Sequence, residues 1–185
     1  MMEGETLAVY GCGGLGIHAV LLGKALGASR VIAVDIDEGA LKNAGEFGAD
    51  EVINAGKVKN VGKAVKEAGR GGVDVIADFS GYMKNIEQSL RAMNTRGRIV
   101  MVGLGRGGLE FVMPQVMIYK MLSVCGSYGC EHGAVGELIE LHQAGKLDLS
   151  RSITSHHSLE EVNQCMHDLH NRKGNPIRYI IEPGA

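Results

Sequence analysis

The sequence predicts an α/β protein with a doubly wound parallel sheet. Short, β-rich apolar segments alternate with segments of helical periodicity, and short turns connect them. The strand segments are almost continuously apolar, as expected when helices cover both faces of a parallel sheet. Because helices separate consecutive strands, we expect right-handed crossovers within one sheet.

The predicted strands and helices alternate in order along the chain. Strands are expected at residues 7–10, 31–35, 51–53, 73–79 and 98–102. Helices are expected at residues 15–26, 38–47, 58–68, 85–93 and 131–144. Gly48 and Gly145 follow the second and the last of these helices, and glycine commonly terminates a helix. Two further extended segments are expected at residues 109–113 and 122–128.

The pattern changes after residue 145. An extended segment at residues 153–156 precedes a helix whose start is a capping box of Ser158 and Glu161. Gly174 ends that helix, and residues 177–181 form a last strand. We therefore expect a main domain over residues 1–145 and a C-terminal β-α-β appendage over residues 146–185.

Composition argues against several classes of partner. The formal net charge of −2 does not provide the basic surface that nucleic-acid binding requires. No apolar run approaches the roughly 18 residues of a membrane span, and the N-terminus lacks a signal peptide's basic start. The cysteines are scattered, which is typical of free thiols in a reducing compartment. We expect a cytoplasmic protein that binds neither nucleic acid nor membrane.

A glycine-rich turn is the most specific motif in the chain. Gly11, Gly13 and Gly16 form a G-x-G-x-x-G pattern, with Gly14 and Leu15 between the last two glycines. The motif directly follows a predicted strand and opens a predicted helix, the arrangement of the dinucleotide-binding Rossmann fold. Glycines let the backbone approach a pyrophosphate, and the N-terminus of the helix favours the anion.

Asp35 at the end of the second strand strengthens this interpretation. A carboxylate about twenty residues after the glycine motif accepts hydrogen bonds from the adenosine ribose hydroxyls. It would also repel the 2′-phosphate of NADP, and the next residues, Ile36, Asp37 and Glu38, supply no cation to neutralise one. The sequence therefore predicts binding of NAD(H) rather than NADP(H).

Several motifs in order resemble the medium-chain dehydrogenase/reductase superfamily, closest in style to its zinc-dependent alcohol and polyol dehydrogenases. They are the glycine turn with the preceding Val9-Tyr10, the strand ending at Asp35, Phe47-Gly48-Ala49-Asp50, Gly103, Gly126-Ser127-Tyr128-Gly129, Leu159-Glu160-Glu161-Val162 and Pro176-Ile177-Arg178. The resemblance covers essentially the whole chain.

The resemblance implies roles for further residues. The backbone of Gly13, Gly14 and Leu15 would hold the pyrophosphate, and the Arg178 guanidinium would contact the same group. The nicotinamide ribose and ring would be lined by Ser80, Val102, Gly103 and Leu104. The carboxamide would meet the backbone of Ser127, Tyr128 and Gly129.

The resemblance also implies a part that this chain lacks. The family's zinc ligands and proton relay are in an N-terminal catalytic domain, so we expect zinc only in that absent domain and assign no catalytic or metal-binding residue here. The expected function is the NAD(H)-binding domain of an alcohol or polyol dehydrogenase. Two alternatives stay open: a stand-alone NAD-binding or sensing module without catalysis, and a fragment of a zinc-independent quinone or enoyl reductase.

The dense apolar stretch between Leu109 and Gly126 predicts an interface. Lys120 is the only lysine or arginine between Phe111 and Cys130, where the parallel sheet should be ending. An apolar sheet edge is a site that proteins cover or pair. We therefore expect a homodimer through this region, with coverage by the chain's own C-terminal unit as the alternative.

Overall fold

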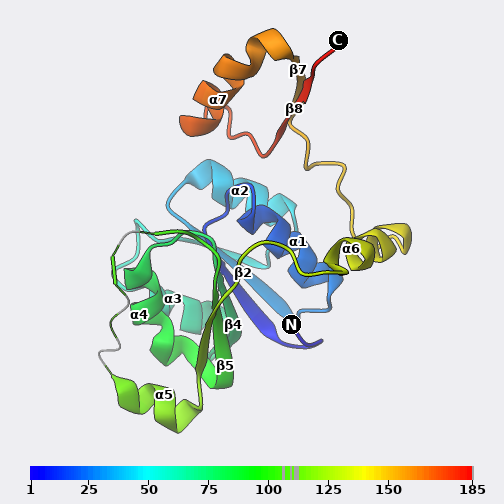
Figure 1. The fold of residues 1–185 in the computed structure, drawn as a ribbon. Coiled ribbons are helices and arrows are strands. Elements are labelled where there is room, and N and C mark those ends of the chain that lie inside the picture. Colours follow the sequence, from blue (N-terminus) through cyan, green and yellow to red (C-terminus); the bar gives the residue numbers. More distant parts are fainter. Residues whose placement is uncertain (106, 109, 111–112, 185) are drawn as a thin grey trace. The chain divides into compact units, whose positions relative to one another are not determined.

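The computed structural model describes residues 1–105, 107–108, 110 and 113–184. Contacts divide the chain into two compact units, Met1–His132 and Gly133–Ala185. This boundary precedes the helix over residues 134–143, whereas the boundary expected from the sequence follows it. Figure 1 shows the elements of both units, which are described separately below.

Within its described residues, the first unit contains a six-stranded parallel sheet of order β3-β2-β1-β4-β5-β6. The strands are β1 (Thr6–Tyr10), β2 (Arg30–Asp35), β3 (Glu51–Asn54), β4 (Val73–Asp78), β5 (Met93–Met101) and β6 (Ser123–Gly126). The helices are α1 (Gly16–Ala25), α2 (Glu38–Glu46), α3 (Val61–Ala68), α4 (Met83–Ser89) and α5 (Pro114–Lys120), and the 3-10 turn η1 (Leu90–Ala92) follows α4. The predicted doubly wound sheet is confirmed, and the strand order reverses direction between β1 and β4.

Helices cover the two faces of this sheet. Figure 1 shows α1 and α2 on one side of the strands and α3 and α4 on the other. Alternate residues of β1 supply the two faces: Ala8 and Tyr10 belong to the core cluster that includes Val61 and Ile86 of α3 and α4. On the other face α1 packs so closely that a Cβ on Gly23 would lie 2.6 Å from the Leu7 side chain.

The later part of the first unit differs from the sequence expectation. The apolar stretch contains the helix α5, which was not predicted. Pro114 occupies its first turn, a position that suits proline, and Met121 ends it in a left-handed conformation. Its half-buried residues Val116 and Met117 and its exposed residues Ile118 and Tyr119 are all apolar, so no periodicity identified it. The expected extended segment at residues 109–113 falls mainly on residues 109, 111 and 112, which are outside the described part of the chain.

The second unit contains the predicted β-α-β arrangement. It comprises α6 (Ala134–Gln143), β7 (Ser155–Ser158), the 3-10 turn η2 (Leu159–Glu161), α7 (Val162–His170) and β8 (Tyr179–Glu182). Strands β7 and β8 pair in parallel. The predicted capping box is confirmed, since the Ser158 N–H donates to Glu161 Oε2 at 3.0 Å. Among the helices described in either unit, none is long and apolar enough to cross a membrane.

Candidate dinucleotide-binding site

The glycine turn after β1 is constrained at two of its positions. Gly11 has a left-handed φ of +82°, and a Cβ there would lie 2.8 Å from the Ser80 backbone nitrogen. At Gly16 a Cβ would lie 1.7 Å from the Gly11 carbonyl oxygen. Only glycine allows the first turn of α1 to start this close to the end of β1. The structure therefore gives these two glycines the packing roles expected from the motif.

Gly13 is different because nothing fills the space beside it. A Cβ at Gly13 would have no heavy atom within 4 Å. The N-cap residue of α1 is Leu15, whose side chain carries no hydrogen-bonding group and is largely exposed. His18 contacts the turn from within α1, with Nδ1 2.7 Å from the Gly14 carbonyl oxygen. The turn thus presents a backbone surface at a helix N-terminus, which suits an anion such as a pyrophosphate.

Asp35 is buried at the end of β2 and is hydrogen-bonded to the glycine turn after β1. Its Oδ2 accepts a hydrogen bond of 2.7 Å from the Cys12 N–H. Its Oδ1 accepts from the N–H groups of Ile36, at 2.7 Å, and Asp37, at 3.0 Å. These backbone donors fix the carboxylate beside the glycine turn, where it can accept further hydrogen bonds from ribose hydroxyls.

Asp78 is a buried carboxylate that sequence reasoning missed. It ends β4, beside β1, and is fully inaccessible to solvent. Its Oδ1 accepts from the Ser80 hydroxyl at 2.6 Å and its Oδ2 accepts from the Gly81 N–H at 3.0 Å. Its signal in the sequence was an acid closing an apolar strand immediately before a Ser-Gly turn. Asp78 fixes the turn after β4, and the Ser80 backbone of that turn lies beside Gly11 of the glycine turn.

The turns after β4 and β5 approach each other through glycines. A Cβ on Gly103 would lie 2.5 Å from the Gly81 nitrogen, and one on Gly105 would lie 1.7 Å from the Gly81 oxygen. The N–H groups of Val102 and Gly103 both donate to the Asp78 carbonyl, at 2.8 and 2.9 Å. Ser80, Val102, Gly103 and Leu104 are thereby brought together at the carboxyl end of the sheet. Leu104 is nearly fully exposed there.

The remaining predicted residues follow β6 or lie in the second unit. The Ser127 N–H donates to the Met101 carbonyl at 2.9 Å, which ties the end of β6 to the end of β5. Tyr128 is almost fully exposed, and Gly129 has a left-handed φ of +69°. Arg178 belongs to the second unit, where its carbonyl accepts from the Thr154 N–H at 2.8 Å. Its expected contact with a pyrophosphate stays a prediction.

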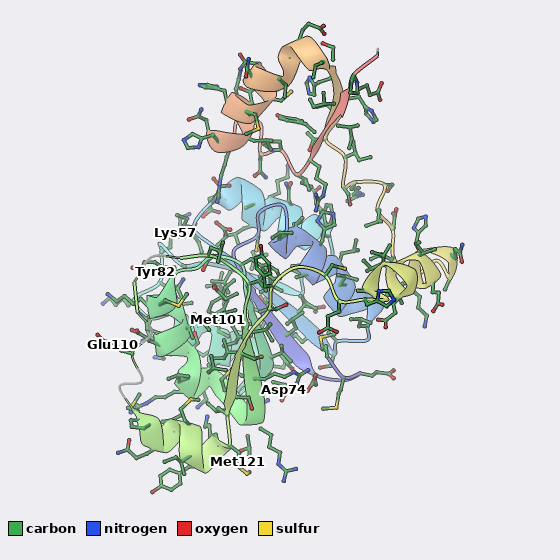
Figure 2. All side chains as sticks on the ribbon, viewed as in Figure 1. Lys57, Asp74, Tyr82, Met101, Glu110 and Met121 are labelled. Atoms are coloured by element: carbon green, nitrogen blue, oxygen red, sulfur yellow. The ribbon has the colours of Figure 1, made fainter. Side chains whose placement is uncertain are left out.

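The turns of the first unit that carry these residues follow the carboxyl ends of the parallel strands β1, β2, β4 and β5. The turn after β1 and the turn after β4 flank the point where the strand order reverses, and open α/β sheets bind ligands at such a point. Tyr82 starts α4 at this end of β4, and Met101 closes β5 (Figure 2). An open backbone cradle, an adjoining helix N-terminus and a buried carboxylate at the end of the next strand together fit a dinucleotide. In the part of the chain that the structure describes, no group of three His, Cys, Asp or Glu residues could hold a metal ion.

Comparison with known proteins identifies the family. The model of a family described as zinc-binding dehydrogenase matches residues 14–144, well over half of the chain. The chain belongs to the zinc-binding dehydrogenase family. The resemblance to zinc-type alcohol and polyol dehydrogenases of the medium-chain superfamily is thereby confirmed.

Individual members of the family match nearly all of the chain. Geraniol dehydrogenase from Carpoglyphus lactis is 31% identical over 97% of this chain and 48% of its own length. An NAD-dependent alcohol dehydrogenase from Saccharolobus solfataricus is 32% identical over 91% of this chain and 48% of its own length. The crystal structure of benzyl alcohol dehydrogenase from Acinetobacter calcoaceticus has a TM-score of 0.86 and 29% identity, and covers 97% of this chain and 50% of that one. The chain spans about half the length of the relatives it matches.

Proposed function

We propose that this chain is the NAD(H)-binding half of a zinc-dependent alcohol or polyol dehydrogenase. The observation that carries the proposal is Asp35, a buried carboxylate at the end of β2 that is hydrogen-bonded to the glycine turn. A dinucleotide has both a ribose, which the Asp35 carboxylate could bind, and a pyrophosphate, which the adjacent glycine turn could bind. The relatives reported above are dehydrogenases of alcohols, which favours this class over quinone or enoyl reductases.

Each part of the cofactor has candidate residues in the first unit. The pyrophosphate would contact the backbone of Gly13, Gly14 and Leu15 at the start of α1, and the adenosine ribose would contact Asp35. The nicotinamide ribose and ring would lie against Ser80, Val102, Gly103 and Leu104. The carboxamide would meet the backbone of Ser127, Tyr128 and Gly129, and Arg178 is the proposed second-unit contact to the pyrophosphate.

The bound nicotinamide supplies hydride transfer to or from an alcohol or carbonyl. We place the catalytic zinc in a further domain, because the matched relatives are about twice as long as the matched segment. The role of this chain's residues is to bind and orient the cofactor. Substrate contacts would come mainly from that further domain.

We also propose that a second copy of the chain pairs along β6. This strand is one of the two edges of the six-stranded sheet, opposite β3. Ile118, Tyr119 and Met121 of the neighbouring α5 region are exposed apolar side chains. A two-fold axis would let the same surface cover itself on both subunits.

Titration calorimetry with NAD⁺ and NADP⁺ tests the cofactor assignment. We expect NADP⁺ to bind at least about tenfold more weakly, which corresponds to about 1.4 kcal/mol, because its 2′-phosphate would face the Asp35 carboxylate. Equal affinities for the two cofactors would contradict the assigned role of Asp35. A chain that binds neither would refute the proposed function.

A further inference from the structure

Three carboxylates line the start of α2, where an adenosine ribose would lie. Asp35 ends β2, Asp37 is the N-cap residue of α2, and Glu38 is the first residue of that helix. The Asp37 side chain accepts from the Ala40 N–H at 2.8 Å. A helix N-terminus ordinarily attracts a phosphate, but here the chain's own carboxylate already occupies that position.

A lysine from the turn after β3 reaches the carboxylates at the start of α2. Lys57 lies on the turn after β3 (Figure 2), and its Nζ is 2.8 Å from Glu38 Oε1. The three residues that follow Asp35 include no cation. Lys57 is supplied instead by the next βα connection, the turn after β3. The adjacent ammonium and the Asn54 amide hold the pKa of Glu38 below its usual value.

Asn54 fixes the geometry of the pair. Its side-chain amide donates to Glu38 Oε1 and to the Ile36 carbonyl, the latter at 3.1 Å. Its backbone carbonyl accepts from the Lys57 N–H at 3.0 Å, and its Oδ1 accepts from the Gly56 N–H at 2.9 Å. The turn that carries Lys57 is therefore hydrogen-bonded to the end of β3 and held beside the start of α2.

We propose that Glu38 is a specificity-determining residue that excludes NADP(H) by neutralising Lys57. The inference rests on the proposed cofactor-binding function and deepens it. Without Glu38, the Lys57 ammonium would be a mobile cation next to the adenosine ribose, able to pair with a 2′-phosphate. With Glu38 present, the Lys57 ammonium is held in an ion pair and is not available to a 2′-phosphate. NAD(H) carries a neutral 2′-hydroxyl instead of a phosphate, so its binding would not depend on whether Lys57 is paired with Glu38.

The test is cofactor selectivity of the whole chain carrying Glu38→Gln. Binding of NADH is followed by its fluorescence, and NAD⁺ and NADP⁺ affinities by displacement of NADH. We expect Glu38→Gln to strengthen NADP⁺ binding about fivefold, a modest gain because the Lys57 ammonium is exposed to solvent. NAD⁺ binding should change less than about twofold, which is the size of a weak electrostatic effect.

Three comparisons separate this mechanism from others. Adding Lys57→Met to Glu38→Gln should abolish the gain, since Lys57 supplies it. Glu67→Gln is the matched control, because it breaks the similarly exposed Lys63–Glu67 pair on α3 and should leave selectivity unchanged. The gain should also shrink in about 1 M salt, where the Debye length is about 3 Å.

Each outcome has a defined meaning. An unchanged NAD⁺ to NADP⁺ ratio in Glu38→Gln, or a gain that survives Lys57→Met, would overturn the inference while leaving the proposed function standing. A wild-type chain that fails to bind NADH would overturn both.

Discussion

Gly13 offers a way to test the proposed pyrophosphate cradle without disturbing the fold. A valine side chain at this position would enter space that no heavy atom within 4 Å of the Cβ occupies. We therefore expect Gly13→Val to change the free energy of unfolding by no more than about 0.5 kcal/mol, as for an unconstrained surface site. The same side chain would keep a pyrophosphate away from the backbone N–H groups. Losing one such charge-assisted hydrogen bond costs about 1.5–3 kcal/mol, or roughly 10- to 150-fold in Kd.

Two other glycines provide the controls for this experiment. Gly16→Ala would place a Cβ 1.7 Å from the Gly11 carbonyl, so we expect about 3 kcal/mol of destabilisation from overpacking. Gly45→Val introduces the same valine into open space on α2, and it should preserve both stability and binding. Urea unfolding measures stability, and calorimetry with NADH measures affinity. If Gly13→Val unfolds the chain, or binds NADH as tightly as wild type, the proposed cradle is wrong.

Two further predictions concern assembly and pH. Tyr119→Lys places a charge in the exposed apolar surface proposed to pair beside the edge strand β6, so sedimentation should show monomers that retain NADH binding. A wild-type chain that is monomeric at tens of micromolar would exclude the dimer. Glu5 receives two 2.7 Å hydrogen bonds from the Arg98 guanidinium, which lowers the pKa of Glu5 to about 2. Since this pKa is depressed in the folded state, the pair stabilises the fold above the unfolded pKa of about 4.5 and loses that contribution as the pH falls through about 2. Glu5→Gln should cost about 1–2 kcal/mol at pH 7, and its stability should converge with that of wild type across this acid range; a pH-independent difference would show that the ion pair is not its cause.

The order of strands and helices was predictable because local signals and packing agree over most of the first unit. The strands β1 and β2 carry apolar residues on both faces, and turns separate them from the helices that follow. The sequence reasoning failed at α5, where Val116, Met117, Ile118 and Tyr119 are apolar around the whole helix. Such a segment has no period to distinguish a helix from a strand. The proline in its first turn was the available signal.

The site was predictable where a motif encodes backbone geometry. Gly11 and Gly16 are required by contacts that any dinucleotide-binding turn of this type makes, so the pattern alone identified them. Asp78 and Lys57 were missed because their importance depends on tertiary neighbours. Asp78 matters because Ser80 and Gly81 fold back onto it. Lys57 matters because β3 pairs with β2 and brings the turn after β3 alongside α2.

The strand order also has a consequence for how the chain folds. β1 precedes the other strands in sequence, yet it lies inside the sheet, between β2 and β4. The pairing of β1 with β2 joins residues close in sequence. The other edge of β1 pairs with β4, which requires residues 73–78 to have been synthesised. Until then the hydrogen-bonding groups along that edge of β1 have no partner strand within this sheet. Long-range parallel pairing forms slowly, and open strand edges invite association with other chains. Aggregation during synthesis should therefore be most acute in the interval between completion of β3 and completion of β4.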